Sequence, residues 1–358
     1  MVTLKDLAQQ LNLSVATVSR ALAGRPVLHP ATMQRVQALA AELGYRPNAS
    51  AVGLRKGQSK LLGVIVPHLD HAFFTRVLAG IESAAGQAGY RIMLCQSNDE
   101  AKQEQQCLRR LLSASADGVL VMTARRHESP TPVVARARHV PMVLISAQAP
   151  AGFAGPVVSS YDQAGAHHAT RHLLKQGYRR IAHVAGPPTD AFFCERRLGY
   201  EAALREHGLE VDPQLIVTGE ASVDGGAQAA HQLLARTSRP DALFAASDLL
   251  AAGAMQALKS QGLRIPLDIG LVGFGSELLS QFTEPALTTI DQHGAALGHR
   301  ATRLLLQLRA GRSQPEAALP ATCQPSLLVR PSSAPRAAVV LPLDAQATAS
   351  LGLWNLTA

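Results

Sequence analysis

The N-terminal part of the chain carries a helical spacing of apolar positions. Four apolar residues spaced i, i+3, i+4 and i+7 from Leu4 onward predict a short amphipathic helix that begins near Thr3. Asn12 tolerates the left-handed backbone of a sharp turn, and Ser14 is a suitable N-cap for a second helix. A third helix is expected over about 31–43. Two short helices joined by so tight a turn are typical of a DNA-binding helix-turn-helix, although an ordinary three-helix cap with an exposed arginine would show the same periodicity.

Beyond residue 60 the pattern changes to buried strands that alternate with amphipathic helices. Continuous apolar runs at 61–66 and 118–122 flank a helical pattern at 73–88, and a second series of the same kind begins near residue 180. This rhythm predicts mainly parallel sheets with helices on both faces. The spacing from Gly80 to Gly89 recurs from Gly199 to Gly208, which indicates two similar α/β lobes. A ligand would then bind between the lobes, at the carboxyl ends of the strands.

Positive charge is concentrated at the N-terminal end. The 358 residues carry a formal net charge of +8. Residues 1–60 hold eight lysines and arginines against two acidic side chains, so they contribute six of those charges. This asymmetry predicts a polyanionic partner at the helix-turn-helix, where neutralised phosphates supply salt-dependent affinity.

Several function classes lack support in the sequence. The four cysteines show no CxxC spacing, so we expect reduced thiols and no metal site. There is no P-loop, GxSxG or HExxH motif, so we expect no enzyme activity, no catalytic residues and no cofactor. No signal peptide or long apolar run is present, which predicts a cytoplasmic protein without a membrane partner.

Three sequence blocks resemble the LacI/GalR family of bacterial repressors in order and spacing. They are the runs VTLKDLA at 2–8, SVATVSRAL at 14–22 and LGYRPNA at 43–49. The resemblance extends to about Ser332 and implies an α-helical headpiece joined to a bilobal α/β core of periplasmic-binding-protein-like type. The expected domains are a headpiece at 1–47, a hinge helix and linker at 48–60, an effector-binding and dimerisation core at 61–333, and a disordered Ala/Pro-rich tail at 334–358.

The resemblance also implies which residues contact DNA. These positions are Thr3, Ser14, Val15, Ala16, Thr17, Arg20, Tyr45, Asn48, Leu54, Arg55 and Lys56. Arg20 can read a guanine edge bidentately, whereas Val15 and Ala16 offer only apolar contact, and the polar positions as far as Asn48 are expected to hold phosphates. Residues 48–56 resemble the hinge helix that folds in the minor groove, where Leu54 would wedge into a central base step. The alternative is that Leu54 belongs to the headpiece core.

The positions that match the family's effector site lie in the predicted core. They are Phe73, Phe74, Asp162, Arg196, Arg197, Ser247, Asp248, Gly275 and Gln292. Gly275 stands where the family carries an aspartate that binds neutral effectors, and two adjacent arginines suit a carboxylate or phosphate. This combination favours a sugar acid over a neutral sugar. The aromatic pair could equally be plain core, and paired arginines are usually solvated.

A transcriptional regulator explains the headpiece, the hinge and the two lobes together. We therefore expect a repressor that binds a pseudo-palindromic operator in double-stranded DNA as a homodimer and is controlled by a sugar or sugar-acid effector. A solute-binding module of sugar uptake would explain only the core, and the sequence shows no signal peptide for it. A sugar enzyme would need catalytic residues, for which the sequence gives no pattern.

Overall fold

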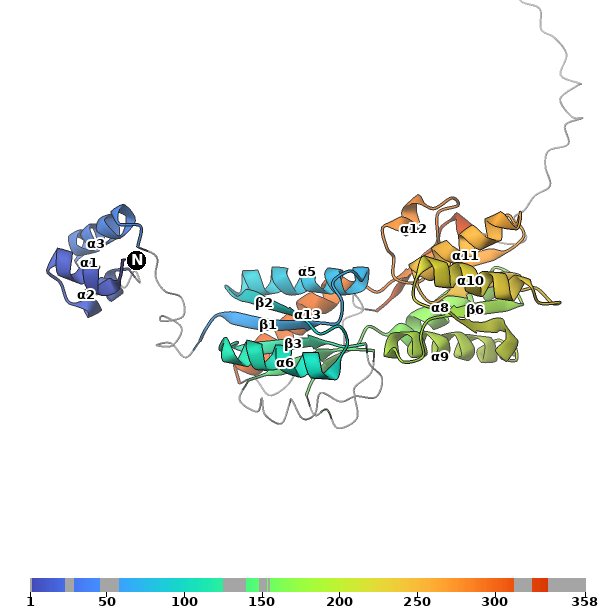
Figure 1. The fold of residues 1–358 in the computed structure, drawn as a ribbon, viewed down its shortest axis with the longest axis horizontal. Helices are drawn as coiled ribbons and strands as arrows, with labels where there is room; N and C mark the ends of the chain where they lie inside the picture. Colours follow the sequence, from blue (N-terminus) through green and yellow to red (C-terminus); the bar gives the residue numbers. More distant parts are fainter. Residues whose placement is uncertain are drawn as a thin grey trace, which may run out of the picture. The chain divides into compact units, whose positions relative to one another are not determined.

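A computed structural model describes residues 2–22, 29–45, 58–124, 140–147, 153, 155–311 and 324–333. Its contacts divide the chain into two units, residues 1–59 and 60–358 (Figure 1). The expected hinge helix and tail lie outside the described residues, and so do the predicted DNA contacts Asn48, Leu54, Arg55 and Lys56.

The first unit is the predicted three-helix headpiece. Its helices are α1 (Leu4–Leu11), α2 (Val15–Leu22) and α3 (Pro30–Glu42). A capping box starts α1, because the Asp6 backbone N–H donates to the Thr3 hydroxyl while the Asp6 carboxylate accepts from the Thr3 backbone N–H. Asn12 ends the helix in the left-handed region, at φ 53°. Buried side chains of all three helices, among them Leu7, Val18 and Val36, form the core.

The second unit contains two parallel sheets, and the first has the strand order β2-β1-β3-β4-β5. Its strands are β1 (Leu61–Val66), β2 (Arg91–Gln96), β3 (Gly118–Met122), β4 (Met142–Ile145) and β5 (Val157–Val158). Helices α5 (Ala72–Gln87) and α13 (Gly294–Arg309) pack on one face, and α6 (Ala101–Ser113) packs on the other (Figure 1). We refer to this sheet and its helices as lobe 1.

Lobe 2 repeats the arrangement with the strand order β7-β6-β8-β9. Its strands are β6 (Ile181–Ala185), β7 (Ile216–Thr218), β8 (Ala242–Ala245) and β9 (Gly270–Val272). Helices α8 (Asp162–Lys175) and α9 (Ala191–Glu206) cover one face, while α10 (Val223–Leu234) and α11 (Asp248–Ser260) cover the other (Figure 1). The remaining elements are η1 (Pro213–Leu215), α12 (Leu279–Phe282), the antiparallel pair β10 (Thr289–Asp291) and β11 (Ser326–Leu328), and η3 (Pro331–Ser333). The predicted fold class is thus confirmed.

The glycines that suggested a repeat lie at close helix contacts. A Cβ on Gly80 would lie 1.9 Å from the Ala295 carbonyl oxygen of α13, and one on Gly199 would lie 2.2 Å from the Gln163 carbonyl oxygen of α8. In each lobe a glycine therefore allows the backbones of two helices to approach one another. The helix α13 follows lobe 2 in sequence but packs in lobe 1, so the chain crosses between the lobes.

Candidate functional site

The headpiece presents the predicted recognition residues on the outer face of α2. Val15 is 41% exposed, and Ala16 and Arg20 are exposed as well. The Ser14 hydroxyl accepts a hydrogen bond from the Thr17 backbone N–H at 3.1 Å and caps the helix. Since the apolar side of α2 is buried in the headpiece core, the exposed side is the one that a DNA groove can receive.

Two predicted phosphate contacts also have local roles in the headpiece. Thr3 is exposed and forms the capping box with Asp6, so its hydroxyl is already used within the helix terminus. Tyr45 is half-buried and packs against the headpiece core. Both residues shape the headpiece as well as standing at predicted DNA contacts.

Three of the predicted effector residues form one buried polar cluster. Arg196 on α9 donates from Nε to Asp162 Oδ1 at 2.8 Å, and its Nη1 donates to the Ala246 carbonyl at 2.7 Å. Gln292 donates to the same Asp162 oxygen at 3.2 Å. The side chains of Arg196 and Asp162 are 4% and 0% exposed. The Ser160 hydroxyl donates to the second oxygen of Asp162, so this carboxylate is held from several directions.

A second polar cluster lies around the N-terminus of α11. The Ser247 hydroxyl caps the helix by accepting from the Leu250 N–H, and Asp248 accepts from the Thr289 hydroxyl at 2.6 Å and from the Glu277 N–H at 2.7 Å. Burial raises the pKa of Asp248 to about 6. Its carboxyl group therefore releases its proton at a higher pH than an exposed aspartate does.

The backbone at Gly275 takes part in a contact between the lobes. Its φ of +124° is a backbone conformation that side-chain-bearing residues rarely adopt. Its carbonyl accepts from Arg76 Nη1 of α5 at 3.1 Å, and the neighbouring Ser276 carbonyl accepts from Arg76 Nη2. Arg76 was not predicted from the sequence, because a single arginine on a helix gives no sign of a partner some 200 positions away.

Phe73 and Phe74 are buried rather than open to solvent. Their rings lie 5.5 Å apart and meet the ring of Phe192, at the start of α9, at 5.7 and 6.0 Å. The Ala191 backbone N–H donates to the Ala124 carbonyl at 2.6 Å, so the N-terminus of α9 contacts lobe 1. Phe73 and Phe74 are therefore buried core residues at the contact between the lobes, where they pack against Phe192.

Two titratable residues beside this contact were missed by the sequence analysis. Burial raises the pKa of Asp190, the N-cap of α9, to about 7. Burial and the nearby Arg196 charge lower the pKa of His71 to about 4, so this imidazole is neutral at physiological pH. In the sequence Asp190 precedes three apolar residues and looks like an ordinary N-cap of a helix. The burial that raises its pKa is visible only in the folded protein, where the start of α9 contacts lobe 1.

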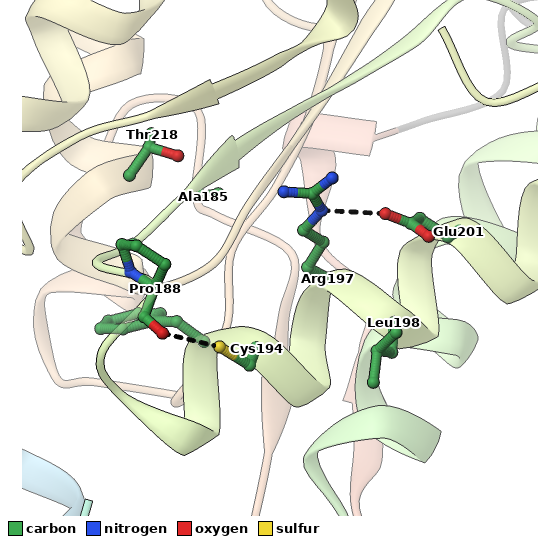
Figure 2. A pocket seen from close by; sticks show the side chains of 9 residues that line it. Ala185, Pro188, Cys194, Arg197, Leu198, Glu201 and Thr218 are labelled. Carbon is green, nitrogen blue, oxygen red and sulfur yellow. Dashed lines mark hydrogen bonds and ion pairs between the residues drawn. The ribbon is translucent and has the colours of Figure 1, made fainter. Parts of the chain in front are cut away.

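Arg197 stands apart from the other predicted effector residues. Its Nε donates to Glu201 at 2.8 Å, and its side chain is 51% exposed. Figure 2 shows this ion pair beside a pocket of about 260 Å³ that Cys194, Leu198 and Thr218 also line. Arg196 and Arg197 therefore face different surroundings and do not form a free cationic pair for an anionic effector.

No helix within the described ranges is long and apolar enough to cross a membrane. The same residues include no group of three histidine, cysteine or acidic side chains placed to hold a metal ion.

Comparison with known proteins matches each of the two units to a protein-family model. Residues 3–48 match the model for bacterial regulatory proteins of the lacI family, and residues 59–322 match the model for periplasmic binding proteins and the sugar-binding domain of the LacI family. The transcriptional repressor CytR of Escherichia coli is 34% identical over 311 residues, which span 87% of this chain and 90% of the relative. Catabolite control protein A of Priestia megaterium is 33% identical over 85% of this chain and 91% of its own length.

Solved structures give the same assignment. The Lac repressor dimer bound to operator and the anti-inducer ONPF aligns with a TM-score of 0.85 at 28% identity, covering 93% of this chain and 99% of that chain. A complex of the regulator CelR with cellobiose aligns with a TM-score of 0.68 at 29% identity, over 93% and 100% of the two chains. These names describe regulators rather than enzymes. The helix-turn-helix headpiece and the two-lobed core thus have one explanation: the chain belongs to the LacI family, as a DNA-binding transcriptional regulator with a small-molecule effector domain.

Proposed function

We propose that the protein is a dimeric repressor whose affinity for a pseudo-palindromic operator is set by a ligand bound between the two lobes. The outward face of α2 would read base edges through Val15, Ala16 and Arg20. Residues 48–56 would supply the hinge helix, with Leu54 at the central base step and with Arg55 and Lys56 on phosphates. The operator-bound dimer of the Lac repressor, to which this chain is similar along most of its length, supports this arrangement.

We infer that the effector is a neutral molecule with several hydroxyl or amide groups, such as a sugar or a nucleoside. The observation that carries this inference is the buried ion pair between Arg196 and Asp162. Because the arginine charge is already balanced, an entering carboxylate or phosphate would gain little net attraction there. The pair still offers polar edges to a neutral ligand, and Gln292 lies beside it.

The neighbouring titratable groups support the same choice. Burial is the main cause of the raised pKa of Asp190; the Arg196 charge opposes the rise, and the charges of Asp162 and Asp99 add to it. Burial and the Asp248 charge likewise raise the pKa of Glu277. An anion would therefore meet several carboxyl groups around the one buried arginine. A partly protonated Asp190 can both donate and accept hydrogen bonds, which suits a hydroxyl group. This inference replaces the preference for a sugar acid that the two adjacent arginines suggested.

Calorimetry with matched ligands tests the inference. Each neutral sugar or nucleoside is compared with its acid or monophosphate, in the wild type and in the Gln292→Ala and Arg197→Ala variants. We expect the neutral member of a pair to bind more tightly, Gln292→Ala to weaken it about tenfold, and Arg197→Ala to leave it unchanged. Tighter binding of the acid, lost in Arg197→Ala, would restore the anionic assignment.

A further inference from the structure

Two cysteines lie on neighbouring elements of lobe 1, one on a strand and one on the helix that packs against it. Cys95 lies near the end of β2, and together with Met93 it packs against α6. Cys107 lies on the inner face of α6 and is 3% exposed. Its Sγ donates to the carbonyl of Gln96, the residue next to Cys95, at 3.4 Å, and Cys95 lies near enough to influence the pKa of the Cys107 thiol. The sequence separates the two cysteines by a loop and two helical turns, so their spacing gives no motif.

The two cysteines lie on either side of residues 97–100, a loop that contributes to the contact between the lobes. β2 is the edge strand of its sheet and continues into residues 97–100 before α6 begins. Within that loop, Asp99 accepts a hydrogen bond from the Ala124 N–H at 3.3 Å. The Ala124 carbonyl in turn accepts from Ala191 of lobe 2. A bond between the two sulfurs would therefore fix the strand and helix on either side of a loop that supports this contact.

We propose that Cys95 and Cys107 form a reversible oxidation site that closes to a disulfide when a hydroperoxide is present. In the first step the Cys95 thiolate attacks the peroxide oxygen, an S–O bond forms, the O–O bond breaks, and water or an alcohol leaves. In the second step the Cys107 sulfur attacks the sulfenic acid, an S–S bond forms, and water leaves with the thiol proton. Two thiols lose two electrons, and the hydroperoxide gains them.

The surroundings of the two thiols set the order of these steps. Cys95 is half-buried whereas Cys107 is buried, so Cys95 is the thiol that a small peroxide would meet first. Burial, together with the adjacent Cys95, raises the pKa of the Cys107 thiol, which makes Cys107 the poorer first nucleophile. Cys107 nevertheless faces the end of β2, where it belongs to the apolar cluster against which Cys95 packs. Cys95 is therefore the peroxide-reactive thiol and Cys107 the resolving thiol.

Mass spectrometry of the full-length protein tests this assignment. The Cys194→Ser/Cys323→Ser double variant retains only the proposed pair; it is treated with hydrogen peroxide and then alkylated under denaturing conditions. We expect the loss of two hydrogen masses, no alkylation, a peptide linking Cys95 to Cys107, and full recovery of both thiols after dithiothreitol. Oxygen added to Cys95 while Cys107 remains alkylatable, or a disulfide between two chains, would overturn the proposal.

Single variants separate the roles of the two thiols. In Cys107→Ser the Cys95 sulfenic acid should persist and react with dimedone, whereas Cys95→Ser should leave Cys107 reduced at the same peroxide concentration. Cys194→Ser is the matched control, because Cys194 lies in lobe 2 near Pro188, and it should not alter formation of the linked peptide. Equal peroxide reactivity of Cys107 in Cys95→Ser would contradict the assigned order.

Discussion

Arg196 and Arg197 are neighbours on α9, yet one is buried and the other is half-exposed. Arg196 pairs with Asp162 from α8, and its guanidinium carbon lies 4.1 Å from the centre of the Phe274 ring. Arg197 pairs with Glu201 one helical turn away. The sequence placed both side chains in an effector site because adjacent positions look alike in a chain, whereas a helix turns them about 100° apart.

The two arginines should therefore differ in their effect on stability. Arg196→Ala leaves the buried Asp162 charge without its partner, and we expect the free energy of unfolding to fall by about 3–5 kcal/mol. Arg197→Ala removes a partly exposed pair and should cost at most about 0.5 kcal/mol. Urea denaturation of both variants measures the difference. Equal losses in the two variants would show that the Arg196–Asp162 pair does not stabilise the core.

Asp190 should make stability depend on pH in one direction. Its pKa is raised from 3.8 to about 7 in the folded protein, so the folded state holds a proton that the unfolded chain releases. This contribution to stability is complete below about pH 4 and is lost as the pH rises to about 7. At about 1.4 kcal/mol per pKa unit, the loss can reach a few kcal/mol.

The Asp190→Asn variant isolates this effect. Asparagine can still accept the Phe192 N–H bond that caps α9, which Asp190 makes at 2.7 Å, but it does not titrate. We expect the stability of the variant relative to the wild type to increase from pH 4 to pH 7 and then to level off. A difference that stays constant across this range would refute the raised pKa.

At the scale of elements, α5 and α13 depend on glycines where their backbones meet. Gly80 and Gly298 face the partner helix, and a Cβ on Gly298 would lie 2.0 Å from the Val77 carbonyl oxygen. Gly86 lies on the same helix as Gly80, but an added Cβ there would meet nothing within 4 Å. The chain thus offers a matched pair of glycines on one helix.

Alanine substitutions should have opposite effects at these two positions. Gly80→Ala forces α5 away from α13, and we expect a loss of about 1–3 kcal/mol or more in the free energy of unfolding. Gly86→Ala adds a helix-favouring residue in open space and should stabilise by up to about 1 kcal/mol. Thermal unfolding followed by circular dichroism measures both. A Gly80→Ala variant as stable as the wild type would show that the helices can separate without cost.

The elements were predictable from the sequence because their signals are local. The apolar runs of β1 and β3, the spacing of α1 and the cap at Ser14 each lie within a few residues of the structure that they specify. The candidate site was only partly predictable. Asp162 and Arg196 are 34 positions apart, and Arg76 is bound to carbonyls about 200 positions away, so their pairing depends on the tertiary fold. Family resemblance suggested which positions belong to the site but could not show which of them already bind one another.

At the scale of the whole molecule, the chain joins a DNA-binding headpiece to an effector domain. The exposed face of α2 should determine sequence preference, so Arg20→Ala should relax specificity at one base pair in each half-site. Lys56→Ala should weaken binding to all sequences similarly and reduce its dependence on salt. Binding of each variant to a library of operator variants measures these two patterns. A uniform loss in Arg20→Ala would show that this side chain contacts phosphate instead.

Ligand bound in the core should change the affinity of the headpiece for DNA, and a titration measures this coupling between the two units. Fluorescence anisotropy would follow the full-length protein on the DNA that it selects from a random pool, with and without the tightest neutral ligand found by calorimetry. Because a ligand shifts an equilibrium only through its different affinity for two states, we predict an operator Kd that changes at least about fivefold in the wild type. In Gln292→Ala this change should require a correspondingly higher ligand concentration. An operator Kd that stays the same when calorimetry shows the site to be saturated would show that ligand binding and DNA binding are not coupled.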